Sequence, residues 1–169
     1  MSSLAKNQSF QAQTNPNPDR DRFLRFPLNS QIDCLVSLAE LIGVIDINLT
    51  KILPVPQIEE YWLGIINWRG EAVWILDLAK VLGAKKWYEG EKPPKSAVAI
   101  LVGQKDCTIG TIVQQANTIE TYNLDELLPV SSATIEQEIK FVRGYFLDDR
   151  KQPVILLDIK TTIQDTLKH

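Results

Sequence analysis

The chain has 169 residues, of which 44% are apolar and 23% charged, as is ordinary for a globular protein of one domain or two small ones. Its 18 basic and 21 acidic side chains give a net charge of −3, which argues against broad nucleic-acid binding, because that binding needs a basic face. No apolar run approaches the roughly 20 residues that span a bilayer, so we expect a cytoplasmic protein without direct membrane insertion.

Residues that support metal or nucleophilic chemistry are scarce. The one histidine, His169, is the last residue, which excludes a site with several imidazoles and disfavours a catalytic triad. Cys34 and Cys107 lack CxxC spacing and are expected to be separate, buried thiols. Motifs of phosphate loops, dinucleotide sites, zinc proteases and serine hydrolases are absent from the sequence. We therefore predict no catalytic residues, no cofactor and no metal.

The first 20 residues are rich in Gln, Asn, Ser and Pro and contain few apolar anchors. Such a segment cannot bury enough apolar surface to offset the entropy that is lost on ordering it. We predict a flexible polar tail over residues 1–20, followed by a folded domain over residues 21–169.

A β-hairpin is predicted where the tail ends. Apolar residues alternate over residues 23–28 and again over residues 32–38, on either side of a polar turn at residues 29–31. Ser37 followed by Glu40 is a weak capping signal, so one helical turn is expected after the second strand. The apolar content continues to residue 47, and prolines then mark a loop.

A second hairpin and a short helix are predicted between Tyr61 and Gly83. Apolar runs at residues 62–66 and 72–76 flank a turn at residues 67–70. Asp77 is placed as the N-cap of a short helix and Gly83 as the residue beyond its end. A charged loop that contains prolines follows, to about residue 95.

The second half of the chain is also composed of short apolar runs. Strands are predicted at residues 98–102, 108–113, 119–122, 141–147 and 153–157, and Asp158 begins a last helix that ends near residue 167. Short strands at this spacing are typical of small barrels or sandwiches.

A faint internal repeat links the two halves. Arg69-Gly70 precedes an apolar strand that ends at Asp77, and Arg143-Gly144 precedes one that ends at Asp158. The same order of elements suggests two related halves, packed as two small barrels. Gly70, Asp77, Gly144 and Asp158 are therefore predicted to be structural residues in turns or caps.

One combination of motifs is more specific. The sequence contains the run Leu63-Gly64-Ile65-Ile66-Asn67-Trp68-Arg69-Gly70, followed by Val73-x-Ile75-Leu76-Asp77-Leu78, and a related strand and aspartate at Leu156-Leu157-Asp158. This combination resembles the CheW-like family of chemotaxis coupling proteins. The resemblance extends over about residues 22–165 and implies a mostly β fold with two five-stranded SH3-like barrels that share a core, plus a few short helices.

The resemblance also implies a function. Members of this family are non-enzymatic adaptors that link the cytoplasmic hairpin tip of methyl-accepting receptors to the regulatory domain of a CheA-type histidine kinase, within a membrane-associated array. Members of the family can also associate weakly with one another through the same faces, and the sequence leaves the oligomeric state open. Gly43, Trp74 and Gln114 depart from the family pattern, which indicates a divergent member with partners of its own.

Candidate receptor contacts lie around the second predicted turn: Gly64, Asn67, Trp68 and Arg69. The planar fork of an arginine at a turn fits carboxylates and amides of a partner helix, and Trp and Arg are enriched in interface hot spots. The alternatives remain open: Arg69 as a solvated turn residue, Trp68 folded back over a barrel mouth, Asn67 as a turn former, and Gly64 as a strand bulge.

Leu41, Val44 and Ile45 are the candidate kinase contacts, as an apolar patch. Residues at this spacing are also typical of a hydrophobic core, and the sequence does not decide between a kinase contact and a buried position. An alternative function is that of a small barrel that binds nucleic acid or another partner, in which aromatic residues stack on bases over a basic groove. The sequence leaves open whether the signalling output is flagellar, pilus-based or other.

Overall fold

The computed structural model describes residues 20–168, apart from residues 117, 132 and 135–137. The predicted tail therefore lies outside the described residues except for Arg20, and His169 lies outside them too. None of the helices in the described part is both long enough and apolar enough to cross a membrane.

Short strands make up most of the described chain. The strands are β1 (Arg20–Pro27), β2 (Asp33–Ser37), β3 (Leu41–Asn48), β4 (Trp62–Trp68), β5 (Glu71–Asp77), β6 (Ser96–Gln104), β7 (Cys107–Val113), β8 (Thr118–Asn123), β9 (Val142–Leu147) and β10 (Pro153–Leu157). The helices are α3 (Leu78–Leu82) and α4 (Ile159–Leu167), with 3₁₀ turns η1 (Leu38–Glu40), η2 (Leu49–Lys51) and η3 (Leu124–Glu126).

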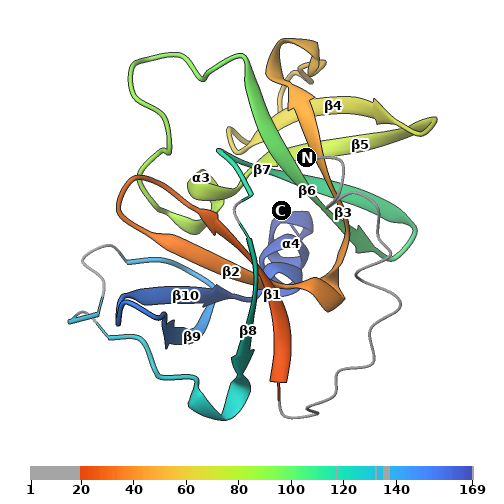
Figure 1. Cartoon of the computed structure of the whole chain (residues 1–169). Coiled ribbons are helices and arrows are strands. Elements are labelled where there is room, and N and C mark those ends of the chain that lie inside the picture. Colours follow the sequence, from red (N-terminus) through yellow and green to blue (C-terminus); the bar gives the residue numbers. More distant parts are fainter. Residues whose placement is uncertain (1–19, 117, 132, 135–137, 169) are drawn as a thin grey trace.

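These strands form two five-stranded sheets, which confirms the predicted fold class. Sheet A has the order β8-β1-β2-β10-β9, and sheet B has the order β3-β6-β7-β5-β4. Each sheet contains one hairpin from one half of the chain and three strands from the other half (Figure 1). Each sheet contains one parallel pair, β2 with β10 and β5 with β7, and this pair is one of two places in the sheet where strands from the two halves meet. The two halves are therefore related, as the repeat suggested, but each completes the other's sheet.

Single β-bridges link the edges of each sheet into a barrel. Leu53 pairs with Ile65 of β4, and Leu128 pairs with Tyr145 of β9. Beside these bridges, Gly64 and Gly144 have φ angles of 137° and 155°, and a Cβ on them would lie 2.1 Å from the Leu53 carbonyl oxygen and 2.5 Å from that of Leu128. Only glycine fits such an approach.

The internal repeat therefore has a different register from the one predicted. Arg69-Gly70 forms a hairpin turn, whereas Gly144 lies inside strand β9, so its predicted place in a turn or cap is wrong. The residue equivalent to Gly144 is Gly64, because each supports the closing bridge of its barrel.

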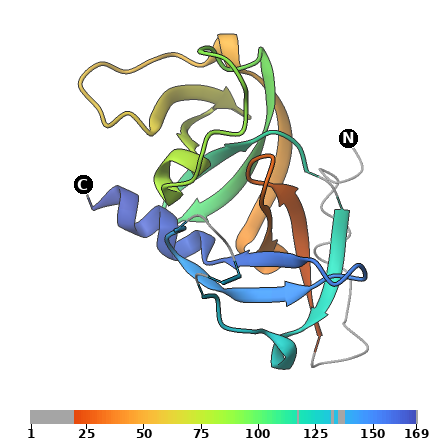
Figure 2. The same ribbon diagram turned by 90° about the vertical axis from the view of Figure 1, so that its left-hand side faces the viewer.

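One large core joins the two barrels, which we call barrel A and barrel B after their sheets, and a smaller core fills barrel A. The large core takes apolar side chains from both sheets, and α4 lies between the sheets and contributes Ile159 and Ile163 (Figure 2). The smaller core consists of Phe23, Leu35, Phe146, Val154 and Leu156. Alternation along β1 and β2 separates these sets, because successive side chains point to opposite faces of a strand.

The segment after the first hairpin crosses from sheet A to sheet B. The expected helical turn is present, since the Ser37 hydroxyl accepts a hydrogen bond from the Ala39 N–H at 3.3 Å, at the start of η1. Strand β3 then follows, where only continued apolar content was predicted. The pairing of β3 with β6 shifts between Leu41 and Gly43, and this irregularity breaks the alternation that marks a strand.

Candidate functional site

The tip of the β4–β5 hairpin carries the residues predicted to contact a receptor. Trp68 pairs with Glu71, so Arg69 and Gly70 alone form the turn, with φ angles of 51° and 81°. Two positive φ angles are typical of the type I′ turn, whose twist matches that of the strands it joins. The Asn67 Oδ1 accepts a hydrogen bond from the Gly70 N–H at 3.2 Å, which fixes the turn and leaves the Arg69 side chain exposed.

Trp68 is not inside a polar turn, as its sequence context suggested, but is the last residue of β4. Its side chain is half-buried and packs against the large core. The Arg69 guanidinium carbon lies 4.7 Å from the centre of the Trp68 ring, within the range of a cation–π contact. The hairpin tip thus presents the exposed Arg69 guanidinium, and its contact with the half-buried Trp68 ring restricts its movement.

Unlike the exposed Arg69 side chain, Gly64 and the three apolar residues of β3 are buried or half-buried. Gly64 is buried, and the backbone that approaches it closely is that of Leu53 in the same chain, which corrects its expected role as a receptor contact. Leu41 and Val44 are only 8% and 6% exposed and belong to the large core. Ile45 is half-buried, and Ile42, which was not predicted, is 39% exposed.

Asp77 and Asp158 occupy equivalent places at the starts of α3 and α4. The Asp77 Oδ1 accepts a hydrogen bond from the Lys80 N–H at 3.3 Å, and the Asp158 Oδ1 accepts one from the Thr161 N–H at 3.0 Å. Burial raises the pKa of Asp77, against the lowering effect of the cap hydrogen bond. Both carboxylates thus satisfy helix N-termini.

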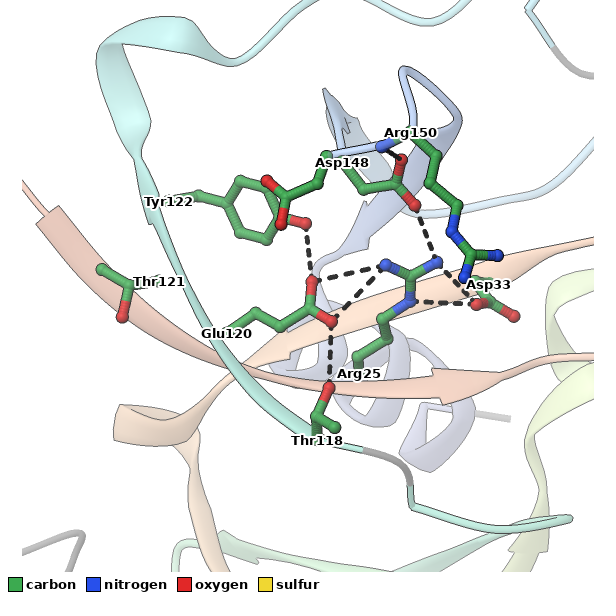
Figure 3. Close-up of a pocket in the computed structure, with 9 residues that line it drawn as sticks. Arg25, Asp33, Thr118, Glu120, Thr121, Tyr122, Asp148 and Arg150 are labelled. Carbon is green, nitrogen blue, oxygen red and sulfur yellow. Dashed lines mark hydrogen bonds and ion pairs between the residues drawn. The ribbon is translucent and has the colours of Figure 1, made fainter.

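A charged cluster that sequence reasoning missed lies beside barrel A (Figure 3). Arg25 of β1 is surrounded by three carboxylates, and it lines an open pocket of about 660 Å³. Its Nε and Nη2 atoms both lie 2.9 Å from the Asp33 Oδ2. Its Nη2 also lies 3.2 Å from the Asp148 Oδ2, and its Nη1 lies 3.4 Å from the Glu120 Oε1.

Further hydrogen bonds hold these carboxylates in place. The hydroxyls of Tyr122 and Thr118 donate to Glu120 at 2.6 and 2.9 Å, whereas Thr121 points away from the cluster (Figure 3). The Asp148 Oδ1 accepts from the N–H groups of Arg150 and Gln152, both at 2.9 Å. The Tyr122 ring stacks on Phe146 with centroids 4.6 Å apart, so the cluster is joined to the small core of barrel A.

The electrostatics of this cluster favour the charged forms of its ion pairs. Burial by itself would lower the pKa of Arg25, but the hydrogen bond to Asp33 and the charge of Glu120 raise it overall. Backbone N–H donors, first that of Gln152, hold the pKa of Asp148 below its usual value. Burial and the hydrogen bond to Glu120 raise the pKa of Tyr122. In the part of the chain that the structure describes, no group of three or more His, Cys, Asp or Glu could hold a metal ion.

Asp148→Asn is expected to destabilise the fold by about 1 kcal/mol at neutral pH, because it removes a charged acceptor of two backbone hydrogen bonds and an ion pair. The pKa of Asp148 is lower when folded, so its stabilising effect is complete above its unfolded pKa of about 3.9 and disappears as the pH falls through the folded value. Urea unfolding of both proteins from pH 7 to pH 3 measures this. The control is Asp149→Asn, an exposed neighbour, and an unchanged gap at pH 3 would contradict the prediction.

The chain resembles known proteins in its sequence and in its fold. The family model described as "CheW-like domain" matches residues 22–167. The chain is 26% identical over 150 residues to a "Probable chemotaxis protein CheW" of Rhizobium etli, with 88% of this chain and 90% of that protein covered. It is 30% identical over 95 residues to "Chemotaxis protein CheW" of Rhizobium meliloti, with 56% and 59% covered. The crystal structure of the scaffolding protein TtCheW from Thermoanaerobacter tengcongensis superposes with a TM-score of 0.68 at 20% identity, covering 87% of this chain and 90% of that one.

Proposed function

The chain belongs to the CheW-like family, and on that premise we propose that it is a non-enzymatic adaptor that couples methyl-accepting receptors to a CheA-type histidine kinase. The match over residues 22–167 is the observation that carries this proposal, and the resemblance to chemotaxis proteins of two Rhizobium species supports it. We place its action in the cytoplasm, at receptor arrays.

The receptor contact is proposed at the tip of the β4–β5 hairpin, through Asn67, Trp68 and Arg69. Arg69 is exposed and forms no ion pair with a described residue, so its donors are available to a partner. Its contact with the Trp68 ring reduces the rotamer freedom that binding would otherwise cost. A carboxylate or amide on a receptor helix is the chemistry that this fork fits.

The kinase contact is proposed on β3, which is an edge strand of sheet B. Ile45 is half-buried and Ile42 is exposed, so these two residues supply the apolar surface of the strand. Leu41 and Val44 pack in the core underneath and would support the contact without forming it.

A calorimetric titration against the regulatory domain of a CheA-type kinase from the same source tests the proposed function. Saturable one-to-one binding supports an adaptor. Absence of binding to every such kinase of that source would remove the coupling mechanism, although the family and the fold would stand. A companion titration with the cytoplasmic hairpin of a receptor tests the other half of the bridge.

Arg69→Ala is expected to weaken receptor binding by about tenfold and to change the melting temperature little, since the exposed fork supplies one strong contact. The measurement is calorimetry with a receptor hairpin fragment, together with thermal unfolding. Lys105→Ala is the matched control, because Lys105 is also an exposed basic residue with positive φ in a hairpin turn. Arg69→Lys keeps the charge but loses the fork, and it should restore only part of the affinity. A large loss of stability in Arg69→Ala would show a structural role instead.

A further inference from the structure

The loop that joins α3 to β6, residues 84–95, has a charge opposite to that of the rest of the protein. It contains four lysines and two glutamates, a net charge of +2, so the remaining residues carry −5 to give the total of −3. Figure 1 shows this loop, in light green, rising from α3 and returning to the start of β6. Such a contrast of charge concentrates anionic groups at one place on an acidic protein.

The loop is tied down at several points. The buried Asn29, in the β1–β2 turn, donates a hydrogen bond from Nδ2 to the Lys85 carbonyl at 3.1 Å, and its Oδ1 accepts from the Gln31 N–H at 2.9 Å. The Leu49 N–H donates to the Lys95 carbonyl at 2.7 Å, and Trp87 is only 8% exposed. The loop therefore forms a fixed wall against the β1–β2 turn.

Between this wall and the turn lies a pocket of about 570 Å³. Its lining combines basic, aromatic and hydroxyl side chains: Lys86, Lys92, Trp87, Tyr88, Ser30 and Ser96. The Lys86 Nζ lies 4.9 Å from the centre of the Tyr88 ring and donates to the Gly90 carbonyl, which holds it in position. Lys92 forms no hydrogen bond or ion pair with a residue that the structure describes.

One donor beside this pocket has no acceptor. The Trp87 Nε1 is buried and has no hydrogen-bond partner among the described residues. A buried N–H without a partner costs on the order of 1–3 kcal/mol, so an acceptor that reaches it would recover that energy. Lysines, hydroxyls and an indole N–H are all donors, and together they select an anionic oxygen ligand.

We propose that this pocket binds a carboxylate side chain from an acidic segment of a partner protein, at a site separate from the hairpin tip. The charge of the lining favours a carboxylate over a phosphate group. Lys86 and Lys92 are opposed by Glu89, so the lining has a net charge of +1, which one carboxylate neutralises and a phosphate dianion exceeds. Trp87 and Tyr88, edge-on with centroids 5.3 Å apart, supply apolar surface for the methylene groups of a glutamate.

The test uses a blocked tetraglutamate peptide as the probe and the four tryptophan indole N–H signals of the whole protein as the NMR readout. Saturable binding is expected, with the largest change at the Trp87 indole signal, identified by its loss in Trp87→Phe. The affinity should fall on raising the salt from about 50 to about 300 mM. The double variant Lys86→Ala/Lys92→Ala should weaken binding by about fivefold.

The matched control is Lys105→Ala/Lys168→Ala, which removes two exposed lysines from a different pocket of the same protein. Equal weakening by both double variants would overturn the proposal, because it would show attraction to charge in general. Equal binding of tetraglutamine, or an unmoved Trp87 signal, would also overturn it. So would tighter binding of inorganic phosphate or an oligothymidylate at the same signals, which would identify a phosphate site. Since neither kinase nor receptor is present, these results are independent of the adaptor proposal.

Discussion

Gly64→Ala is expected to lower the free energy of unfolding by about 3 kcal/mol and the melting temperature by about 10 °C, in a protein of this size. A Cβ at this position would lie 2.1 Å from the Leu53 carbonyl oxygen, and the φ angle of 137° is unfavourable for any residue with a side chain. The backbone must therefore separate where the Leu53–Ile65 bridge closes barrel B. Thermal and urea unfolding measure the loss.

Two other glycines make this prediction specific. Gly144→Ala is expected to destabilise barrel A similarly, because its Cβ would lie 2.5 Å from the Leu128 carbonyl oxygen. Gly90→Ala is the matched control: its φ angle is also positive, at 84°, but no atom lies within 4 Å of the added carbon. It should cost only about 1 kcal/mol, from the left-handed conformation alone. Equal losses in Gly64→Ala and Gly90→Ala would show that barrel closure does not depend on the close approach.

Arg25→Met is expected to lower the free energy of unfolding by about 2–3 kcal/mol at neutral pH. The substitution preserves much of the apolar stem but leaves three carboxylates together without their shared cation. The Arg25 side chain is 17% exposed, so water weakens the interaction only in part. The deficit should shrink as the pH falls through the lowered pKa of Asp148, because the protonated carboxyl no longer forms an ion pair with Arg25.

Urea unfolding at pH 7 and at pH 3 tests this dependence. Adding Glu120→Gln to Arg25→Met should recover part of the lost stability, since it removes one of the repelling charges. Arg150→Met serves as the control, because Arg150 lines the same pocket but is exposed and forms no ion pair with a described residue. It is expected to change stability by no more than about 0.5 kcal/mol. A deficit in Arg25→Met that is the same at both pH values would contradict the electrostatic explanation.

The features that sequence predicts well depend on residues that are close together in the chain. The hairpin turns at residues 29–31 and 67–70 and the short helix between Asp77 and Gly83 follow from local polarity and capping, and the structure contains all of them. The fold class follows from the same short-range signals together with the family motifs. The hairpin at residues 67–70 is tighter than expected, because Asn67 and Trp68 still pair within the strands.

Features that depend on distant residues could not be predicted in this way. Arg25 meets Glu120 and Asp148 across 95 and 123 residues of chain, and alternation in β1 marked it only as a polar position. Strand β3 was missed because its pairing shifts at Gly43, and the burial of Leu41 and Val44 depends on the core that β3 then joins. The exchange of strands between the two halves is likewise invisible to local patterns, since either half alone has the elements for one barrel.

That exchange has a consequence for how the protein is made. The hairpin β1–β2 is synthesised before the other described strands, whereas its parallel partner β10 is synthesised after all of them. At 5–20 residues per second, the hairpin waits on the order of ten seconds for that strand. During this interval the edge of β2 and the apolar side chains behind it lack their native cover. Sheet B needs only β3 to β7, so it can assemble earlier and offer the waiting hairpin a surface before sheet A is complete.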